Sequence, residues 1–213
     1  ALGTAAIVAL DSADLAALTG TQAAALTTTQ LQAVSSGDMA GLSSDAIASL
    51  SATQIAALSS SQLNALGTEH WAAMSTAQVR AIGTAQLAGL TTDDLNALNT
   101  DQFAALSTSQ VAALSATQVG NLESADLGAL SSSHIRALGS AAIAALDSAD
   151  LAVMGTAQIA ALTTGQLAAI DSADLAGLTT DGIASLSTAQ MAALTSGQLN
   201  ALASEHWNAM STA

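Results

Sequence analysis

Three histidines, His70, His134 and His206, are the residues of this sequence best suited to proton transfer or metal binding. Imidazole titrates near neutral pH and is a common zinc ligand. Each histidine, however, replaces the Gln or Asp of a short repeated pattern, far along the chain from the other two. A metal site needs several ligands together, and the Ser and Asp around each histidine recur throughout the chain, so no Ser-His-Asp triad stands out. We expect no enzyme, no cofactor and no metal site.

Two tryptophans mark equivalent places in a longer duplication. Trp71 occurs in TEHWAAM and Trp207 in SEHWNAM, each directly after a histidine. A larger core residue explains both tryptophans. The alternative is an aromatic anchor for a partner, because tryptophan is enriched at binding hot spots. We therefore keep Trp71, His70, Trp207 and His206 as candidate partner contacts.

Carboxylates dominate the charged residues. Asp147 with Asp150, and Asp171 with Asp174, supply oxygen ligands of the kind that calcium prefers, although helix capping explains both pairs without a metal. Arg80 and Arg136 are the only Lys or Arg residues, and we expect both to point outward. The formal net charge of -14 argues against nucleic-acid binding and against an anionic membrane surface, since both need a basic face.

The composition also excludes a membrane span. The chain is 51% hydrophobic but only 1% aromatic, so Ala, Leu and Ile must supply its core. A span needs about 20 nearly unbroken apolar residues, and here Ser, Thr, Asp or Gln interrupt every few positions. We expect no membrane insertion. No basic region followed by an apolar stretch opens the chain, so we expect no signal peptide in it.

A single repeat organises the whole sequence. From Gly3 to Met210 it divides without insertion or deletion into 26 octads, which we number 1 to 26. Position 5 is a large apolar residue in every octad except that of Ala23, and position 8 is Leu in 20 octads. Position 7 is usually Ala, position 2 is Ser or Thr in 23 octads, and position 4 is most often Gln. The unit reads [STDG]-[ST]-x-[QD]-[LIV]-x-A-L.

This unit is typical of a short helix that carries its own start signal. Ser, Thr or Asp at position 1, followed three residues later by Gln or Asp, is close to a capping box. Position 2 is the other candidate for the cap. We expect no single continuous helix, because eight residues advance a helix by about 800° and the apolar stripe would rotate by about 80° per octad. A β-solenoid is the alternative fold, but it favours alternating β-branched residues and glycine turns.

An octad cannot fold alone. Ordering eight backbones costs about 8–16 kcal/mol, whereas burying two aliphatic side chains returns about 3–6 kcal/mol. The octads must therefore stack, with positions 5 and 8 inward and the small position 7 allowing close approach. We expect an all-α solenoid of about 26 short capped helices, one per octad, over residues 1–213 as a single domain.

A longer duplication indicates how the octads are related to one another in the solenoid. Residues 1–77 match residues 137–213 at 52 of 77 positions, a displacement of 136 residues or 17 octads. Seventeen is odd and is not divisible by three. If the helices alternated between two or three inequivalent structural positions, matching octads of the two copies would therefore occupy different positions although their sequences are alike. We therefore expect all octads to be equivalent and related by one repeated screw operation, with two to four octads in each coil.

The units STAQVRAI, STSQVAAL, GTAQIAAL and STAQMAAL resemble the Ala, Leu, Ser, Thr and Gln octapeptide arrays of very large bacterial surface or secreted proteins, some of them described as adhesin-like. The resemblance covers the whole chain. It implies an extracellular spacer or stalk, and it carries no functional residues with it. The calcium-binding Gly-Gly-x-Gly-x-Asp nonapeptide of secreted toxins is absent.

We therefore predict a structural repeat segment, a rigid elongated spacer or stalk of a bacterial surface or secreted protein, without catalysis. The alternative is a binding module that uses its repeated exposed surface to recognise a protein, a glycan or ice. Because the first and last coils of such an array expose apolar faces, head-to-tail self-association is also expected.

Overall fold

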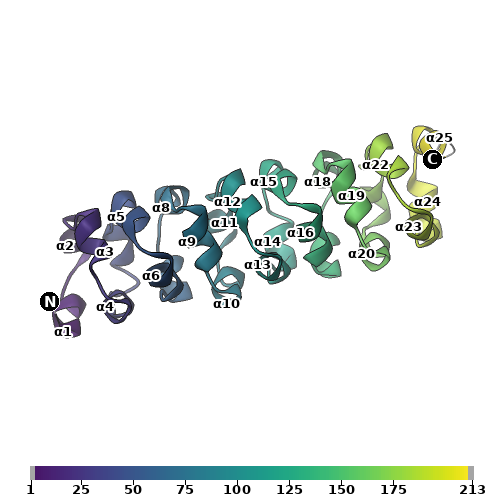
Figure 1. Cartoon of the computed structure of the whole chain (residues 1–213). Coiled ribbons are helices and arrows are strands. Elements are labelled where there is room, and N and C mark those ends of the chain that lie inside the picture. The colour runs from purple at the N-terminus through teal and green to yellow at the C-terminus, as the bar shows by residue number, and fades with distance from the viewer. Residues whose placement is uncertain (1–2, 211–213) are drawn as a thin grey trace. The chain divides into compact units, whose positions relative to one another are not determined.

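The computed structural model describes residues 3–210, which form short helices joined by short extended links (Figure 1). Within this range there are 25 α-helices, one 3-10 helix and no strand. The predicted all-α fold is therefore confirmed, and the β-solenoid alternative is excluded for these residues. None of these helices is long and apolar enough to cross a membrane.

The chain divides into two compact units, Ala1–Leu106 and Ser107–Ala213, with the division between two octads. A single domain over residues 1–213 stays a prediction. Unit 1 contains α1 (Thr4–Val8), α2 (Ser12–Ala16), α3 (Gly20–Ala24), α4 (Thr28–Ala33), η1 (Met39–Gly41), α5 (Ser44–Ser49), α6 (Ala52–Ala56), α7 (Ser60–Leu63), α8 (Thr68–Ala73), α9 (Thr76–Ala81), α10 (Thr84–Ala88), α11 (Thr92–Asn96) and α12 (Thr100–Ala105).

Unit 2 continues the same series, with one helix in each octad. Its helices are α13 (Thr108–Ala112), α14 (Ala116–Val119), α15 (Ser124–Ala129), α16 (Ser132–Ala137), α17 (Ser140–Ile143), α18 (Ser148–Val153), α19 (Thr156–Ala161), α20 (Thr164–Ala169), α21 (Ser172–Leu175), α22 (Thr180–Ala184), α23 (Thr188–Ala192), α24 (Ser196–Ala201) and α25 (Ser204–Met210).

In both units a helix packs against the helix three octads further along the chain. In unit 1, α5 contacts α8 and α8 contacts α11; in unit 2, α13 contacts α16 and α16 contacts α19. Three octads, or 24 residues, therefore complete one coil. The octad pattern alone allowed two to four octads in each coil.

The core consists of positions 5 and 8, as predicted. Leu31, Ile55 and Val79 at position 5 are fully buried, and Leu42 and Leu58 at position 8 are almost fully buried. Trp71 and Phe103, also at position 5, are the largest of the fully buried side chains. Burial at two positions per octad is sufficient because every coil repeats the same pair.

Small residues let neighbouring coils approach closely. A Cβ atom on Gly41, at position 7, would lie 2.2 Å from the carbonyl oxygen of Ser12 in the octad three places earlier. Gly177 would meet Ser148 at the same distance in the second copy of the duplication. No described residue has a positive φ angle, so these glycines are needed for space rather than for backbone conformation.

One octad departs from the expected α-helix. Octad 5, residues 35–42, forms only the short 3-10 helix η1, and its Asp38 N-cap makes no side-chain capping bond. The octad has Gly37 and Gly41 at positions 3 and 7, and glycine costs about 1 kcal/mol relative to alanine in a helix. Two glycines in one octad explain why the tighter and shorter helix forms there.

Candidate functional site

Every α-helix begins at position 2 of its octad, and the N-cap of α1 to α24 is the residue at position 1, which decides between the two cap positions that the sequence allowed. In octad 4, the Thr27 hydroxyl accepts a hydrogen bond from the backbone N–H of Gln30 at 3.2 Å. The Gln30 side-chain oxygen in turn accepts one from the Thr27 N–H at 2.7 Å. This reciprocal capping box recurs with Ser, Asn and Asp at position 1.

The position 4 glutamine also has a second function, which the sequence analysis missed. The Gln62 Nε2 donates to the carbonyl oxygens of Leu31 at 2.8 Å and Val34 at 2.9 Å, both in the octad four places earlier. Gln78 does the same with Ile47 at 2.8 Å and Leu50 at 2.9 Å. The side chain thus caps the N-terminus of its own helix and binds carbonyl oxygens at the C-terminal end of another helix.

We call this arrangement the amide clamp: a position 4 side chain that accepts from the N–H of position 1 and donates to the carbonyls that end the helix four octads earlier. Within each unit, packing joins an octad to the third one before it, and the clamp, where present, joins it to the fourth. Glutamine clamps include those of Gln54, Gln62, Gln78, Gln86 and Gln102 in unit 1, and those of Gln158, Gln166, Gln190 and Gln198 in unit 2.

The clamp explains why position 4 of the clamped octads is Gln and not Glu. A glutamate accepts the capping bond equally well, but an ionised carboxylate has no proton to donate to a carbonyl. Gln102 is 1% exposed and Gln166 is 2% exposed, so a charge at either place would be buried beside carbonyl oxygens. A carboxamide is neutral and satisfies both ends of the contact.

His70 shows that imidazole fills the same place. Its Nδ1 accepts from the Gly67 N–H at 2.8 Å, and its Nε2 lies 2.6 Å from the carbonyl oxygen of Leu42. Because Nδ1 is the acceptor, the tautomer that satisfies both contacts carries its proton on Nε2. His134 and His206 also accept the capping bond through Nδ1, from Ser131 at 3.3 Å and Ala203 at 3.2 Å.

The histidines are buried and lie in three separate octads. His70, His134 and His206 are 2%, 6% and 5% exposed. The Glu69 carboxylate lies 3.6 Å from the Nδ1 of His70. Among the described residues, no group of three or more His, Asp or Glu is placed to hold a metal ion. The observed contacts of the histidines are those of helix caps.

Trp71 is enclosed by the core. Its side chain is fully buried, and its indole Nε1 donates to Asp94 Oδ1 at 3.0 Å. The other oxygen of Asp94 accepts from the N–H and the hydroxyl of Thr91 at 3.1 and 2.6 Å, so one carboxylate caps α11 and holds the indole. The Trp71 carbonyl accepts from the Gln102 clamp.

The four candidate partner contacts therefore lie in different surroundings. His70, Trp71 and His206 are buried, whereas Trp207, in α25, is 48% exposed. Of the four, Trp207 offers the largest exposed side chain to a partner. Partner binding by any of them stays a prediction.

The paired aspartates make capping contacts. Asp147 Oδ1 accepts from the N–H groups of Ala149 and Asp150 at 2.8 and 3.0 Å, and Asp150 Oδ2 accepts from the Asp147 N–H at 3.1 Å. Asp171 accepts from the Ala173 N–H at 2.8 Å. Burial raises the pKa of Asp150, helped by the charges of Asp147 and Asp174, while the bond from the Asp147 backbone opposes the rise.

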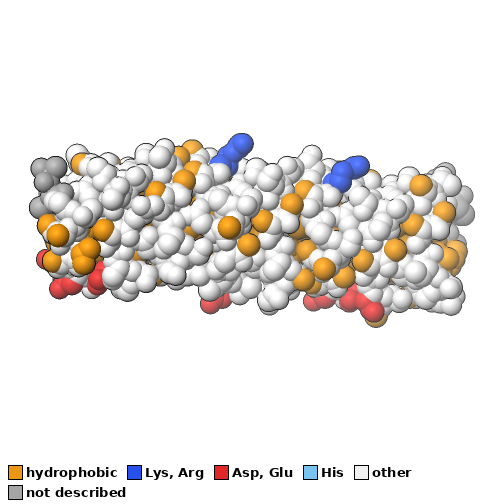
Figure 2. All heavy atoms as spheres, turned by 90° about the horizontal axis from the view of Figure 1, so that it is seen from below, with side chains coloured by type: hydrophobic (Ala, Val, Ile, Leu, Met, Phe, Trp, Pro, Cys, Tyr) orange, Lys and Arg blue, Asp and Glu red, His pale blue; other side chains and the backbone are white. Residues whose placement is uncertain are grey.

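The two cationic side chains lie on the surface. Arg80 and Arg136 are exposed, as predicted, and the face drawn in Figure 2 shows apolar side chains scattered among polar atoms.

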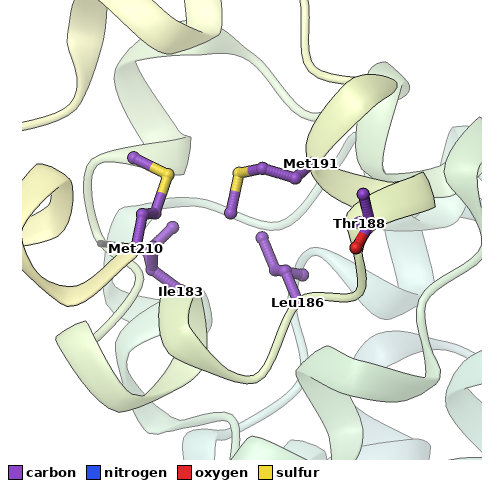
Figure 3. Close-up of a pocket in the computed structure, with 5 residues that line it drawn as sticks. All are labelled: Ile183, Leu186, Thr188, Met191 and Met210. Atoms are coloured by element: carbon purple, nitrogen blue, oxygen red, sulfur yellow. The ribbon is translucent and has the colours of Figure 1, made fainter. Parts of the chain in front are cut away.

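A cavity of about 170 Å³ in unit 2 is lined by Ile183, Leu186, Thr188, Met191 and Met210. The side chains of Met191 and Met210 point toward each other across it (Figure 3). The Thr188 hydroxyl is the only polar side-chain group in this lining, and none of the five side chains is titratable.

The family of the chain follows from its repeat. The ALTTAQ repeat matches six segments, residues 31–68, 71–93, 92–123, 119–152, 143–173 and 167–204. The chain belongs to the ALTTAQ repeat family. No curated protein matches the sequence. The six letters of the ALTTAQ repeat correspond to positions 7, 8, 1, 2, 3 and 4 of the octad, as in ALTTTQ at residues 25–30, so the motif ends on the clamp residue.

Proposed function

We propose that this chain is a structural segment, a rigid elongated spacer or stalk of a bacterial surface or secreted protein, and that it has no catalytic activity. The observation that carries the proposal is the amide clamp. It uses the recurring polar side chain of the octad to hold helices together, and His70 has the same use. The membership in a tandem-repeat family supports a structural role.

The clamps and the packing together support rigidity. Packing links octads that are three apart, and the clamp links octads that are four apart, so neighbouring coils are joined by two different kinds of contact. Both contacts join octads that are no more than four places apart in the sequence. A segment built in this way is lengthened by adding coils, without a new core for each length.

Variants of different length test the spacer. Duplication of residues 155–178, three octads and one coil, should add about 10 Å to the longest dimension measured by small-angle scattering. The helical content per residue, measured by circular dichroism, should stay constant. An insertion of 20 residues breaks the octad register and serves as the control, with loss of helical content expected. An unchanged longest dimension after the 24-residue duplication would contradict the spacer.

The surface location needs its own test. Antibodies raised against this chain should label intact cells of the bacterium that encodes it, or should detect the chain in the culture medium. Detection only after the cells are lysed would contradict an extracellular spacer.

Self-association is a further part of the proposal. Each copy of the octad array contains both the amide donors and the carbonyl acceptors of the clamp. The donors of one copy can therefore bind the acceptors of a second copy and continue the array. Sedimentation of the 213-residue chain should show association that increases up to millimolar concentration. A strictly monomeric species at that concentration would contradict it.

A further inference from the structure

Three stacked helices of unit 2 carry an acid at both capping positions. Helix α15 packs against α18, and α18 packs against α21. Their octads begin with Glu123, Asp147 and Asp171 and have Asp126, Asp150 and Asp174 at position 4. We call these six residues the acidic seam.

The position 4 aspartates of the seam do not form the amide clamp. An ionised Asp150 or Asp174 has no proton to donate to the carbonyls four octads earlier. The position 8 carbonyls in those places are those of Leu122 and Leu146, and within the described residues no side chain donates to either. By contrast, Gln166 in the same unit donates to the equivalent carbonyl of Leu138 at 2.7 Å. Helices α18 and α21 therefore pack against the helix three octads earlier but make no amide clamp to the octad four places earlier, whereas a clamped octad makes both contacts.

The charges of the seam also repel one another. Asp174, three octads along the chain from Asp150, is close enough to oppose its ionisation. Asp126 is 4% exposed. Its burial, and then the charge of Glu123, raise its pKa to about 6.

No cation on the packed helices offsets these charges. The helices α15, α18 and α21 have no Lys, Arg or His, and neither has α24, which packs against α21. Helix α19, whose Gln158 clamps the end of α15, has no charged or titratable residue either. The titratable groups of these five helices and their N-caps are therefore the six carboxyls of the seam.

We propose that the acidic seam is a pH-sensitive weak point at which unit 2 opens locally when the carboxyl groups ionise. When Asp126 and Asp150 are protonated, their repulsion with the neighbouring carboxylates disappears and their burial is no longer penalised. When these two groups ionise, they favour the open state, in which water solvates them. The Gln166 clamp, whose acceptors Ile135 and Leu138 lie outside the seam octads, keeps its hydrogen bonds in acid and at neutral pH.

The sign follows from proton linkage. The folded state holds the Asp126 proton more tightly than the unfolded chain does, because the pKa rises from 3.8 to about 6. The stabilisation is therefore complete below about pH 4 and is lost as the pH rises through about 6. Asp150 contributes in the same direction.

Amide hydrogen exchange at pH 4.5 and 7.5, corrected for the intrinsic effect of pH, tests the proposal on the unmodified chain. Amides of residues 123–130, 147–154 and 171–178 should lose protection at least about tenfold between the two values, since one pKa unit corresponds to a factor of ten. Residues 155–170, which contain the Gln158 and Gln166 clamps, should change by less than about twofold. An equal change in both sets would overturn the proposal.

A variant identifies the groups responsible. Asp126→Asn with Asp150→Asn removes both raised carboxyls while it keeps side chains of nearly the same size, and the difference between the two pH values should fall below about twofold. Asp181→Asn, at an exposed position in the first turn of α22, is the control and should leave the difference unchanged. A persistent tenfold difference in the double variant would also overturn the proposal. If the double variant loses helical content, the proposal is still tested in the unmodified chain, by comparing the loss of amide protection in the seam octads with that in residues 155–170.

Discussion

His70 and Leu42 are joined by a contact of 2.6 Å between the imidazole Nε2 and the carbonyl oxygen, across 28 residues of sequence. The same separation joins Gln62 to Val34 and Gln78 to Leu50. Histidine thus replaces glutamine because its two ring nitrogens reproduce one acceptor and one donor.

The first prediction follows from this equivalence. His70→Gln should retain both contacts and change the free energy of unfolding by less than about 0.5 kcal/mol. His70→Glu keeps only the acceptor and places a charge near the Leu42 carbonyl, so it should destabilise the chain by about 2 kcal/mol or more. Urea unfolding followed by circular dichroism measures both variants. Equal stability of the two would show that the Leu42 contact contributes nothing.

The glutamine clamp makes a second prediction with a control in the same chain. Gln102→Glu should cost about 2–3 kcal/mol, because Gln102 is buried and donates to Trp71 at 2.9 Å and Met74 at 2.6 Å. Gln22→Glu should cost less than about 0.5 kcal/mol, because Gln22 is exposed and its side chain, among the described residues, bonds only to Thr19, within the capping box. The midpoints of urea unfolding measure the stability of both variants. Equal losses of stability would mean that the capping bond alone, and not the clamp, accounts for glutamine at position 4.

A clamp can also be introduced. Asp150→Gln gives octad 19 a donor that can reach the Leu122 carbonyl four octads earlier, and it removes a carboxyl whose pKa is raised. We expect stabilisation by about 1–2 kcal/mol at neutral pH. Asp14→Gln, at the matching position of the first copy, is the control, because the described chain has no octad four places before it. The midpoint of thermal unfolding measures both, and the idea fails if the two variants are equally stable.

The two tryptophans offer a spectroscopic prediction. Trp71→Phe removes the donor to Asp94 Oδ1 and should destabilise the chain by about 1–3 kcal/mol, whereas Trp207→Phe should cost less than about 1 kcal/mol because Trp207 is 48% exposed. Fluorescence of each single-tryptophan variant reports the environment directly. The Trp71 emission should lie at shorter wavelength than that of Trp207, and the reverse order would contradict the buried position of Trp71.

Close backbone approach makes the fifth prediction. Gly177→Ala places a Cβ 2.2 Å from the Ser148 carbonyl oxygen and should destabilise the chain by about 2 kcal/mol. Gly165→Ala, within α20, meets nothing within 4 Å and should stabilise it by about 0.5–1 kcal/mol. Calorimetry of the two variants should therefore show shifts of opposite sign.

Local contacts explain how much of the fold was predictable. The capping box joins residues three apart, such as Thr27 and Gln30, so its spacing is visible in the sequence. The buried positions 5 and 8 are visible for the same reason. The 3-10 helix of octad 5 was not predicted, although Gly37 and Gly41 were a signal of it.

The sequence by itself determined the octad, its short helix and its buried positions, because an eight-residue segment contains all of the groups involved. Only the tertiary structure decided that three octads make a coil and that position 4 reaches the octad four places earlier. A solenoid with two or four octads in each coil buries the same residues and caps the same helices. The partner of the Gln62 amide, 28 residues away at Val34, depends on the turn of the coil, and no local spacing specifies it.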